Sequence, residues 1–302
     1  MTEREPWRDT LRTSVAVSRD GTRIAYEALG RGQRALLLAN GPGGRHYSWT
    51  PLLDALWERY RLVTWDYRGL FGSGTPATAR QLALTHHVDD ALAVCAAEGI
   101  ERCVVVGWSM GVQVGLDLAA TRPALVGGLI LVNGTYGHAL SSGFQPLFPV
   151  PLLPKRIHAA IDFMRRTPGS AGVLARVVRA IEAPTLALLA LTAGRRAVAL
   201  APLLRRYFDD VLGDDFENFL RLFQELDAHS VYHLLPEIRA PALVVSGLLD
   251  MLTPARQSRE IAARLPDAEH LALARASHFA LLERPELVVP AVQRFLDARA
   301  AW

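Results

Sequence analysis

A serine, an aspartate and a histidine that lie far apart in the chain have the side chains needed for acyl-transfer chemistry. Ser109 lies at the centre of a Gly-Trp-Ser-Met-Gly pentapeptide, Asp250 follows an apolar run, and His278 lies near the end of the sequence. A serine hydroxyl attacks a carbonyl at neutral pH only when a base takes its proton, and an imidazole is suited to this. A carboxylate on the second ring nitrogen fixes the tautomer and stabilises the imidazolium. The residue types predict Ser109 as nucleophile, His278 as base and Asp250 as the group that orients the ring.

The residues around Ser109 predict a sharp turn from a strand into a helix. An apolar run at 103–106 precedes the pentapeptide, and a helix-like stretch at 112–120 follows it. Gly107 and Gly111 leave room for such a turn, because a Cβ at either position would collide with neighbouring backbone. The hydroxyl would then be exposed near the positive end of a helix dipole. The alternative is a glycine-rich turn whose serine only caps the helix.

Asp250 and His278 are also placed just after strand-like runs, the first of them at 242–247. Their order after Ser109, aspartate and then histidine, is the one found where a serine nucleophile sits on a strand–helix turn. Each residue has a simpler interpretation. Asp250 could cap a helix that begins near Pro254, although Thr253 is better placed for this, and His278 could be a core histidine with its hydrogen bonds satisfied.

Five segments of the chain resemble those of the α/β-hydrolase-fold superfamily, in particular its serine esterases and lipases. They are Asn40-Gly41-Pro42-Gly43-Gly44, residues 66–74, the pentapeptide around Ser109, Gly247-Leu248-Leu249-Asp250, and Ser277-His278-Phe279 with residues 282–286. The resemblance implies an α/β enzyme with a mostly parallel eight-stranded sheet, helices on both faces, and no cofactor or metal. It says little about the substrate, because this family covers many chemistries.

Strands and helices are expected to alternate outside the middle third of the chain. Strand patterns lie at 13–17, 22–28, 35–39, 62–65, 103–106, 128–132 and 242–247, and helix patterns at 49–60, 81–98 and 112–120. This alternation predicts a parallel sheet between helix layers, with ligands at the carboxyl ends of the strands. We expect the helix at 81–98 to place Asp89 and Asp90 on its solvated side. Asp66 and Arg68 are interpreted as residues that organise a loop.

The stretch from 138 to 232 has little strand signal and is expected to be a helical cap inserted into a core formed by 1–137 and 233–302. It begins with Pro146, Pro149, Pro151 and Pro154, and helix patterns follow at 155–166, 171–181, 185–200 and 216–228. An apolar cap would exclude water from the serine and shape an apolar cleft. The alternative is that these helices only pack on the core or form a dimer face.

The loop at 40–44 departs from the family pattern where a second oxyanion donor is needed. The backbone N–H of Met110, just after the nucleophile, is expected to be the first donor. The resemblance places the second donor after a His-Gly pair, but here that residue is Pro42, which has no N–H. We expect Gly43 to donate instead, within a hole formed by Met110, Gly43 and Gly41. Gly44 and the side chain of Asn40 remain alternatives.

The substrate pocket is expected to include Asn40 and Trp108. Trp108 should mainly pack against its neighbours, and the side chain of Met110 should edge the pocket. Three arginine pairs at 165–166, 195–196 and 205–206 are interpreted as solvated helix faces. An acidic group at 209–217 is interpreted as a solvated loop that could instead bind an amine.

Bulk properties exclude several classes of protein. The chain has 302 residues and a net charge of +3 with scattered arginines, which does not indicate nucleic acid or a membrane surface as partner. No apolar run reaches the roughly 18 residues that span a bilayer, and no secretory signal pattern is present, so a cytoplasmic protein is expected. Cys95 and Cys103 are expected to be buried free thiols. The histidines show no metal-ligand spacing.

The expected function is hydrolysis of an ester or lactone with apolar groups through an acyl-enzyme, by a monomer or a homodimer whose partner is a small-molecule substrate. Carbon–carbon bond hydrolysis, perhydrolysis and aminopeptidase activity are alternatives within the same fold. An alternative of another class is a small-molecule receptor with this fold and little turnover.

Overall fold

The core of the protein is an eight-stranded sheet, seen in a computed structural model that describes residues 6–139, 153–167, 170–180 and 182–302. The spatial order of the strands is β1-β2-β4-β3-β5-β6-β7-β8. The pairs β1–β2 and β2–β4 are antiparallel, and all other neighbours are parallel. The strands are β1 (Arg12–Val17), β2 (Arg23–Leu29), β3 (Ala35–Ala39), β4 (Arg61–Trp65), β5 (Cys103–Trp108), β6 (Val126–Val132), β7 (Ala242–Gly247) and β8 (Ala268–Leu273). The α/β-hydrolase fold expected from the sequence is confirmed.

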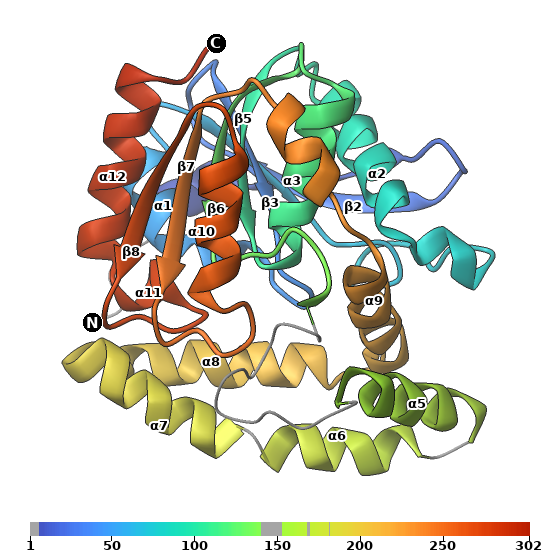
Figure 1. The fold of residues 1–302 in the computed structure, drawn as a ribbon. Helices are drawn as coiled ribbons and strands as arrows, with labels where there is room; N and C mark the ends of the chain where they lie inside the picture. Colours follow the sequence, from blue (N-terminus) through green and yellow to red (C-terminus); the bar gives the residue numbers. More distant parts are fainter. Residues whose placement is uncertain (1–5, 140–152, 168–169, 181) are drawn as a thin grey trace.

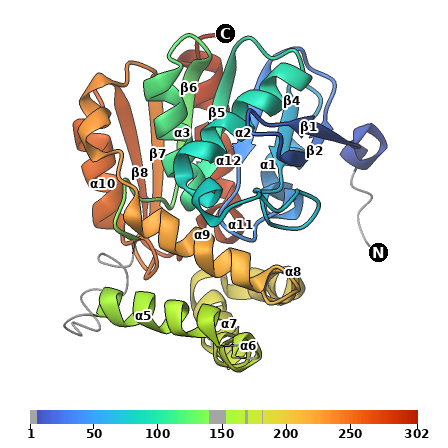
Figure 2. The ribbon, with the colours of Figure 1, turned by 90° about the vertical axis from the view of Figure 1, so that its right-hand side faces the viewer.

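Helices cover both faces of this sheet and lie across one of its ends (Figure 1). The helices of the core are α1 (Thr50–Leu56), α2 (Leu84–Ala97), α3 (Met110–Thr121), α10 (Ala255–Arg264), α11 (Ala280–Glu283) and α12 (Pro285–Ala298). The helical insertion, a name used here for the helices between β6 and β7, comprises α5 (Leu153–Arg166), α6 (Ala171–Ala180), α7 (Glu182–Ala193), α8 (Ala197–Val211) and α9 (Phe216–Ala228). Figures 1 and 2 show α5 to α8 lying below the ends of the strands.

Two hydrophobic layers follow from the alternation of side chains along fully buried strands. In β5, Cys103 and Val105 join a cluster formed with α2, α3 and α10, whereas Val104, Val106 and Trp108 join one formed with α1, α11 and α12. Burial of each large aliphatic side chain stabilises the fold by about 2 kcal/mol. The central strands are therefore fixed from both sides, which gives the loops at their carboxyl ends a rigid base.

The insertion leaves and rejoins the core through a short neck. Gly137 and Ser230 form an antiparallel bridge, and the Val231 N–H donates to the Tyr136 carbonyl at 2.8 Å. These contacts lie close to the boundaries predicted at 138 and 232. The predicted proline cluster lies outside the described residues, apart from Pro154 at the start of α5.

The helix predicted at 185–200 is two helices in the structure. α7 ends at Ala193, Gly194 takes a φ of +57°, and α8 begins at Ala197 and continues to Val211. Only glycine adopts this conformation at little cost, so the chain turns there. By length and mean hydropathy (1.4), Glu182–Val211 is apolar enough to cross a membrane. In the structure it is folded back on itself, with Leu189 and Phe208 in one shared cluster.

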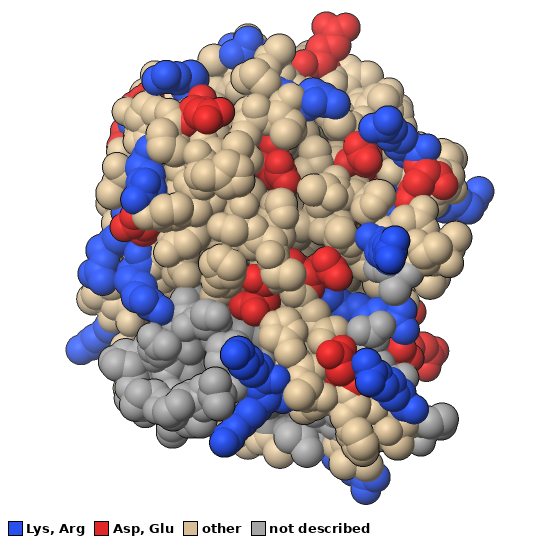
Figure 3. All heavy atoms as spheres, turned by 45° about the vertical axis from the view of Figure 1, so that its right-hand side comes forward, with Lys and Arg blue, Asp and Glu red and all other residues tan. Residues whose placement is uncertain are grey.

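Charged side chains are interspersed on the face of the molecule shown in Figure 3, where Lys and Arg lie among Asp and Glu. Arg196 pairs with Glu286 at 2.8 Å, and Arg205 lies 3.5 Å from Glu182. Exposed pairs of this kind contribute little to stability. They agree with the interpretation of these arginines as solvated.

Asp90 is not on the solvated side of α2, contrary to the sequence prediction. Both Asp90 and Arg68 have fully buried side chains, and the guanidinium donates to the Asp90 carboxylate from two nitrogens. Arg68 also donates to Asp20 at 2.7 Å and to the Gln81 carbonyl at 2.9 Å. The pair ties the loop after β4 to α2 and to the β1–β2 turn, which agrees with a loop-organising role for Arg68.

Replacement of Asp90 by asparagine should strongly destabilise the protein, because it leaves the buried guanidinium without one of its two counter-charges. Loss of one partner from a buried pair costs about 3–5 kcal/mol. Asp89→Asn, at the half-buried neighbouring position, is the matched control and should change the free energy of unfolding by less than about 0.5 kcal/mol. Urea denaturation measures both variants. Equal effects would contradict the structural role of Asp90.

His87 should make the protein less stable in mild acid. Its ring is fully buried, and this burial lowers its pKa from 6.5 to about 4, although nearby Asp90 opposes the shift. The unfolded chain then binds a proton that the folded chain does not, so stability is complete above pH 6.5 and falls as the pH drops toward 4. The loss is about 3 kcal/mol. Thermal melts from pH 7.5 to 4 should show a smaller fall for His87→Gln than for His86→Gln, its half-buried neighbour.

Candidate active site

Ser109 lies at the junction of β5 and α3, in the sharp turn from strand to helix that the sequence predicts. Its φ is +57° and its ψ is −117°, and it is 7% exposed. A Cβ added to Gly107 would lie 2.4 Å from the Gly111 carbonyl oxygen, and one added to Gly111 would lie 1.9 Å from that of Ala39. The glycines are required for the reason inferred from the sequence. A non-glycine residue held at positive φ in this way is typical of a functional site.

Asp250 and His278 are brought together at the carboxyl ends of β7 and β8. The Nδ1 atom of His278 lies 2.9 Å from Oδ2 of Asp250, whose side chain is fully buried. Burial alone would raise the pKa of Asp250, but the charge and hydrogen bond of His278, with the bonds from Thr253 and Asn133, lower it below its usual value. Asp250 therefore stays ionised and can orient the ring and stabilise its charged form.

Asn133 and Thr253 were not predicted as site residues, yet both hold Asp250. The Asn133 amide donates to Asp250 Oδ2 at 2.7 Å and to the Ser277 carbonyl at 3.0 Å. The Thr253 hydroxyl donates to the same Oδ2 at 2.7 Å, and its N–H donates to Oδ1 at 2.9 Å. Asn133 directly follows β6, and its position after a predicted strand was the signal available in the sequence. These bonds also show that Asp250 does not cap α10, whose N-cap residue is Pro254.

Glu283 holds the turn that carries His278. Its buried carboxylate accepts hydrogen bonds from the N–H of Ser277 at 2.5 Å and from the Ser277 hydroxyl. Burial raises the pKa of Glu283, and the bonds from Ser277 oppose this shift. His278 is thus positioned from both sides, by Asp250 through its ring and by Glu283 through the preceding residue.

An aromatic wall joins the serine turn to the histidine. The indole N–H of Trp108 donates to the His278 carbonyl at 2.9 Å, and the two ring centroids lie 5.5 Å apart. Phe279 and, from α8, Tyr207 pack against the same indole, at 5.5 and 6.0 Å. The residue that precedes Ser109 is therefore in contact with His278. Among the described residues the Ser109 hydroxyl makes no hydrogen bond, and such bonds often form only when substrate binds.

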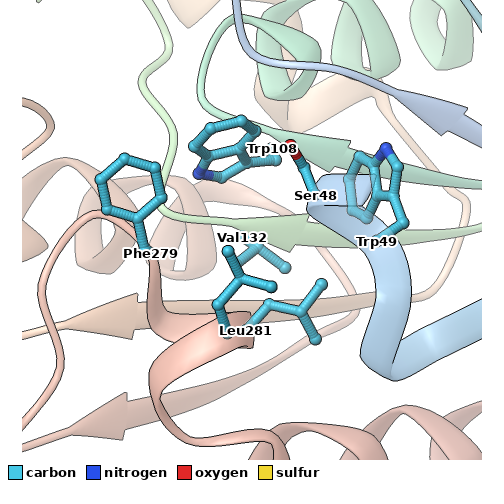
Figure 4. Close-up of a pocket in the computed structure, with 7 residues that line it drawn as sticks. Ser48, Trp49, Trp108, Val132, Phe279 and Leu281 are labelled. Carbon is cyan, nitrogen blue, oxygen red and sulfur yellow. The ribbon is translucent and has the colours of Figure 1, made fainter. Parts of the chain in front are cut away.

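Behind this wall is a small apolar cavity of about 10 Å³, which has room for about one water molecule (Figure 4). Its lining residues are Ser48, Trp49, Trp108, Val132, Phe279, Leu281 and Leu282. Trp108 packs here as expected. Met110 does not edge this cavity, because its side chain is fully buried among the core residues around α3.

Asn40 supports the loop after β3 instead of facing a ligand. Its amide donates to the Thr64 hydroxyl and to the Trp65 carbonyl, both at 2.9 Å, and its side-chain oxygen accepts from Trp49 at 2.6 Å. Both amide hydrogens are therefore used within the core. The structure does not support the predicted place of Asn40 in the substrate pocket or its alternative role as an oxyanion donor.

The rest of the loop forms a tight turn against the serine. The Gly44 N–H donates to the Gly41 carbonyl at 2.9 Å, and Gly43 has a φ of +75°. With Pro42 at the second position, these are the features of a type II turn. A Cβ on Gly41 would lie 3.0 Å from the Cβ of Ser109. The bond within the turn occupies the N–H of Gly44, whereas the N–H of Gly43 has no partner among the described residues.

The acidic group at 209–217 is occupied by contacts within the protein. Asp210 accepts from the Tyr47 hydroxyl at 2.7 Å, and Asp215 accepts from the Phe71 N–H at 2.6 Å. Asp209 pairs with Arg179 at 2.7 Å, and Glu217 pairs with Arg221. These contacts attach α8 and the start of α9 to the core and join α8 to α6, and they do not favour the amine-binding alternative.

Comparisons with known proteins agree with this geometry. A family model described as "Alpha/beta hydrolase family" matches residues 36–291. The "Putative carbamate hydrolase RutD" of Rhizobium rhizogenes is 29% identical over 269 residues, which cover 88% of this chain and 94% of that protein. An enol-lactonase from Burkholderia xenovorans is 25% identical, with a TM-score of 0.75 over 94% of this chain and 100% of the other. An esterase from Exiguobacterium antarcticum, 17% identical, shares the fold with a TM-score of 0.76 over 95% of this chain and 100% of the other.

Replacement of Asp250 by asparagine should lower kcat for ester hydrolysis by about 10³–10⁴-fold, because an amide neither fixes the imidazole tautomer nor stabilises its charge. Hydrolysis of p-nitrophenyl butyrate measures the effect, and circular dichroism checks that the variant is folded. A loss below tenfold in a folded variant would contradict the role given to Asp250.

Proposed function

The chain belongs to the alpha/beta hydrolase family, and on that premise we propose that it is a serine hydrolase that cleaves an ester or a lactone with apolar groups. The observation that carries the proposal is the bond between Asp250 and His278, 2.9 Å long, beside the strained turn that presents Ser109. An ionised carboxylate, an imidazole and a serine hydroxyl, which follow β7, β8 and β5, are the groups that acyl transfer needs.

The reaction proceeds in two halves. The Ser109 oxygen forms a bond to the substrate carbonyl carbon while His278 takes its proton, and the carbonyl electron pair moves onto oxygen. The tetrahedral intermediate collapses, the bond to the leaving alcohol breaks, and the alcohol receives the proton from His278. Water then attacks the acyl-enzyme by the same route and releases the acid. In a lactone the leaving alcohol stays on the acyl chain, so one hydroxy acid is released.

The negative charge on the intermediate is held by backbone N–H groups. Met110 is the first residue of α3, so its N–H has no partner within the helix. The N–H of Gly43 is the second donor, since Pro42 has none and the turn uses that of Gly44. Gly41, which packs against the Ser109 Cβ, is the remaining candidate. Each such donor contributes about 10²–10³ in rate.

The substrate class follows from the walls of the site. Trp108, Tyr207 and Phe279 are packed around His278 and offer aromatic surface to a bound acyl or alcohol group. This favours an apolar ester or lactone. The similarity to an enol-lactonase supports a lactone as substrate. The relative named as a carbamate hydrolase adds carbamates to the compounds to be tested.

Residues 138–232 act as a cap in this proposal. Tyr207 on α8 contacts Trp108 and Phe279, so the helical insertion forms one wall of the site. A cap of this kind excludes water and strengthens the electrostatic interactions that stabilise the intermediate.

The proposal is tested with Ser109→Ala on a panel of p-nitrophenyl esters, lactones, carbamates, peptides and diketones, with products identified by mass spectrometry. Wild-type protein should hydrolyse an ester or lactone, and the variant should lose a factor of about 10⁴ or more in kcat. A fluorophosphonate should label wild-type protein once, at Ser109. Label on another residue would refute the assignment.

The panel also separates the alternatives. Turnover confined to peptides or diketones would point to aminopeptidase or carbon–carbon bond hydrolase activity, and peracid formation from an acid and hydrogen peroxide would point to a perhydrolase. Tight binding of a lactone without turnover would favour a receptor.

A further inference from the structure

We propose that Tyr207 of α8 is a positioning residue that sets the direction of the Gly43 N–H and so completes the oxyanion hole. This inference rests on the hydrolase mechanism proposed above. Its basis is one contact between the helical insertion and the core, in which the Tyr207 hydroxyl donates to the Pro42 carbonyl at 2.8 Å.

The contact controls the N–H because both groups belong to one peptide unit. The peptide between Pro42 and Gly43 is planar, and in the trans form its C=O and N–H point in opposite directions. A hydrogen bond that fixes the Pro42 carbonyl therefore also fixes the Gly43 N–H.

The turn alone allows this peptide two orientations, although Pro followed by Gly is common in the type II form. Type I and type II turns share the φ of their second residue and differ by a rotation of the central peptide. Proline fits the second position of both, and glycine at the third accepts a negative or a positive φ. An outside contact can hold the orientation seen here, with Gly43 at a φ of +75°, against rotation to the other form. The Tyr207 hydroxyl makes that contact.

Tyr207 is itself held in place. Its ring meets Trp108, Phe208 and Phe279 edge-on, with centroids 6.0, 6.2 and 5.8 Å away. Burial raises the pKa of its phenol, so the hydroxyl keeps its proton and remains a donor. The hole is thus complete only while α8 lies against the loop.

This chain needs such a support because three alternatives for the second donor are missing or occupied. Pro42 removes the amide at the family position, the side chain of Asn40 is bound within the core, and the turn occupies the N–H of Gly44. A glycine N–H that is free to rotate would hold the oxyanion for only part of the time.

The test compares Tyr207→Phe with Tyr47→Phe. Tyr47 donates from its hydroxyl to Asp210 on the same helix at 2.7 Å, so its loss weakens the attachment of α8 without touching the loop peptide. Tyr207→Phe should lower kcat by about tenfold or more, which is part of the roughly 10²–10³-fold decrease in kcat expected when a donor is removed completely. KM should change by less than about twofold. Tyr47→Phe should leave both constants near the wild-type values.

A second measurement isolates the oxyanion. A trifluoromethyl ketone forms a tetrahedral adduct with a serine, whereas the corresponding alcohol does not. Tyr207→Phe should raise the inhibition constant of the ketone about tenfold. It should change the inhibition constant of the alcohol little. Equal losses of kcat in the two tyrosine variants, or equal losses for both inhibitors, would show that Tyr207 only attaches the helix and would overturn the proposal.

Crystal structures of both variants provide a test that does not depend on enzyme activity. The Pro42–Gly43 peptide should rotate or take two orientations in Tyr207→Phe and stay unchanged in Tyr47→Phe. An unchanged peptide in a folded Tyr207→Phe protein would overturn the inference. If the wild-type protein shows no turnover that depends on Ser109, the proposed function is refuted. The crystal structures would still decide whether Tyr207 sets the orientation of the Pro42–Gly43 peptide.

Discussion

The close approach of two backbones, at Gly111 and Ala39, is the constraint on which the rest of the site depends. A Cβ on Gly111 would lie 1.9 Å from the Ala39 carbonyl oxygen, so only glycine lets the start of α3 press against the end of β3. This contact places the loop at 40–44 directly against Ser109. Ser109 and the expected oxyanion donors are therefore positioned by the same packing.

A buried carboxylate is a second constraint, because it must be compensated wherever it lies. Asp250 is compensated by His278, Asn133 and Thr253, which come from three different loops at the ends of β6, β7 and β8. The need to satisfy one charge thus fixes the relative positions of three strand ends. The buried pair of Arg68 and Asp90 likewise fixes the loop after β4 against α2, on the other side of Ser109 in the strand order.

The fold and the three proposed catalytic residues could be predicted from the sequence because their signals are local. The glycines around Ser109 and the apolar runs of the central strands are set by contacts within a few residues. The strand-like run expected before His278 is β8 (Ala268–Leu273). The sequence did not give its bounds, since it is a half-exposed edge strand with glutamate and histidine among its residues. Asp90 was assigned to solvent because its partner Arg68 lies 22 residues away, and no periodicity reveals a buried ion pair.

The conformation of the loop at 40–44 could be predicted only in part from the sequence. Proline at position 42 reveals at once that one N–H is missing, but the orientation of the following peptide depends on Tyr207, 165 residues away. A turn of Pro and Gly can take either of two forms, of which type II is common for this pair. In our proposal its state is held by α8, a helix outside the turn. The role proposed for Ser109 could therefore be inferred from nearby residues, whereas the orientation of the Pro42–Gly43 peptide required the tertiary structure.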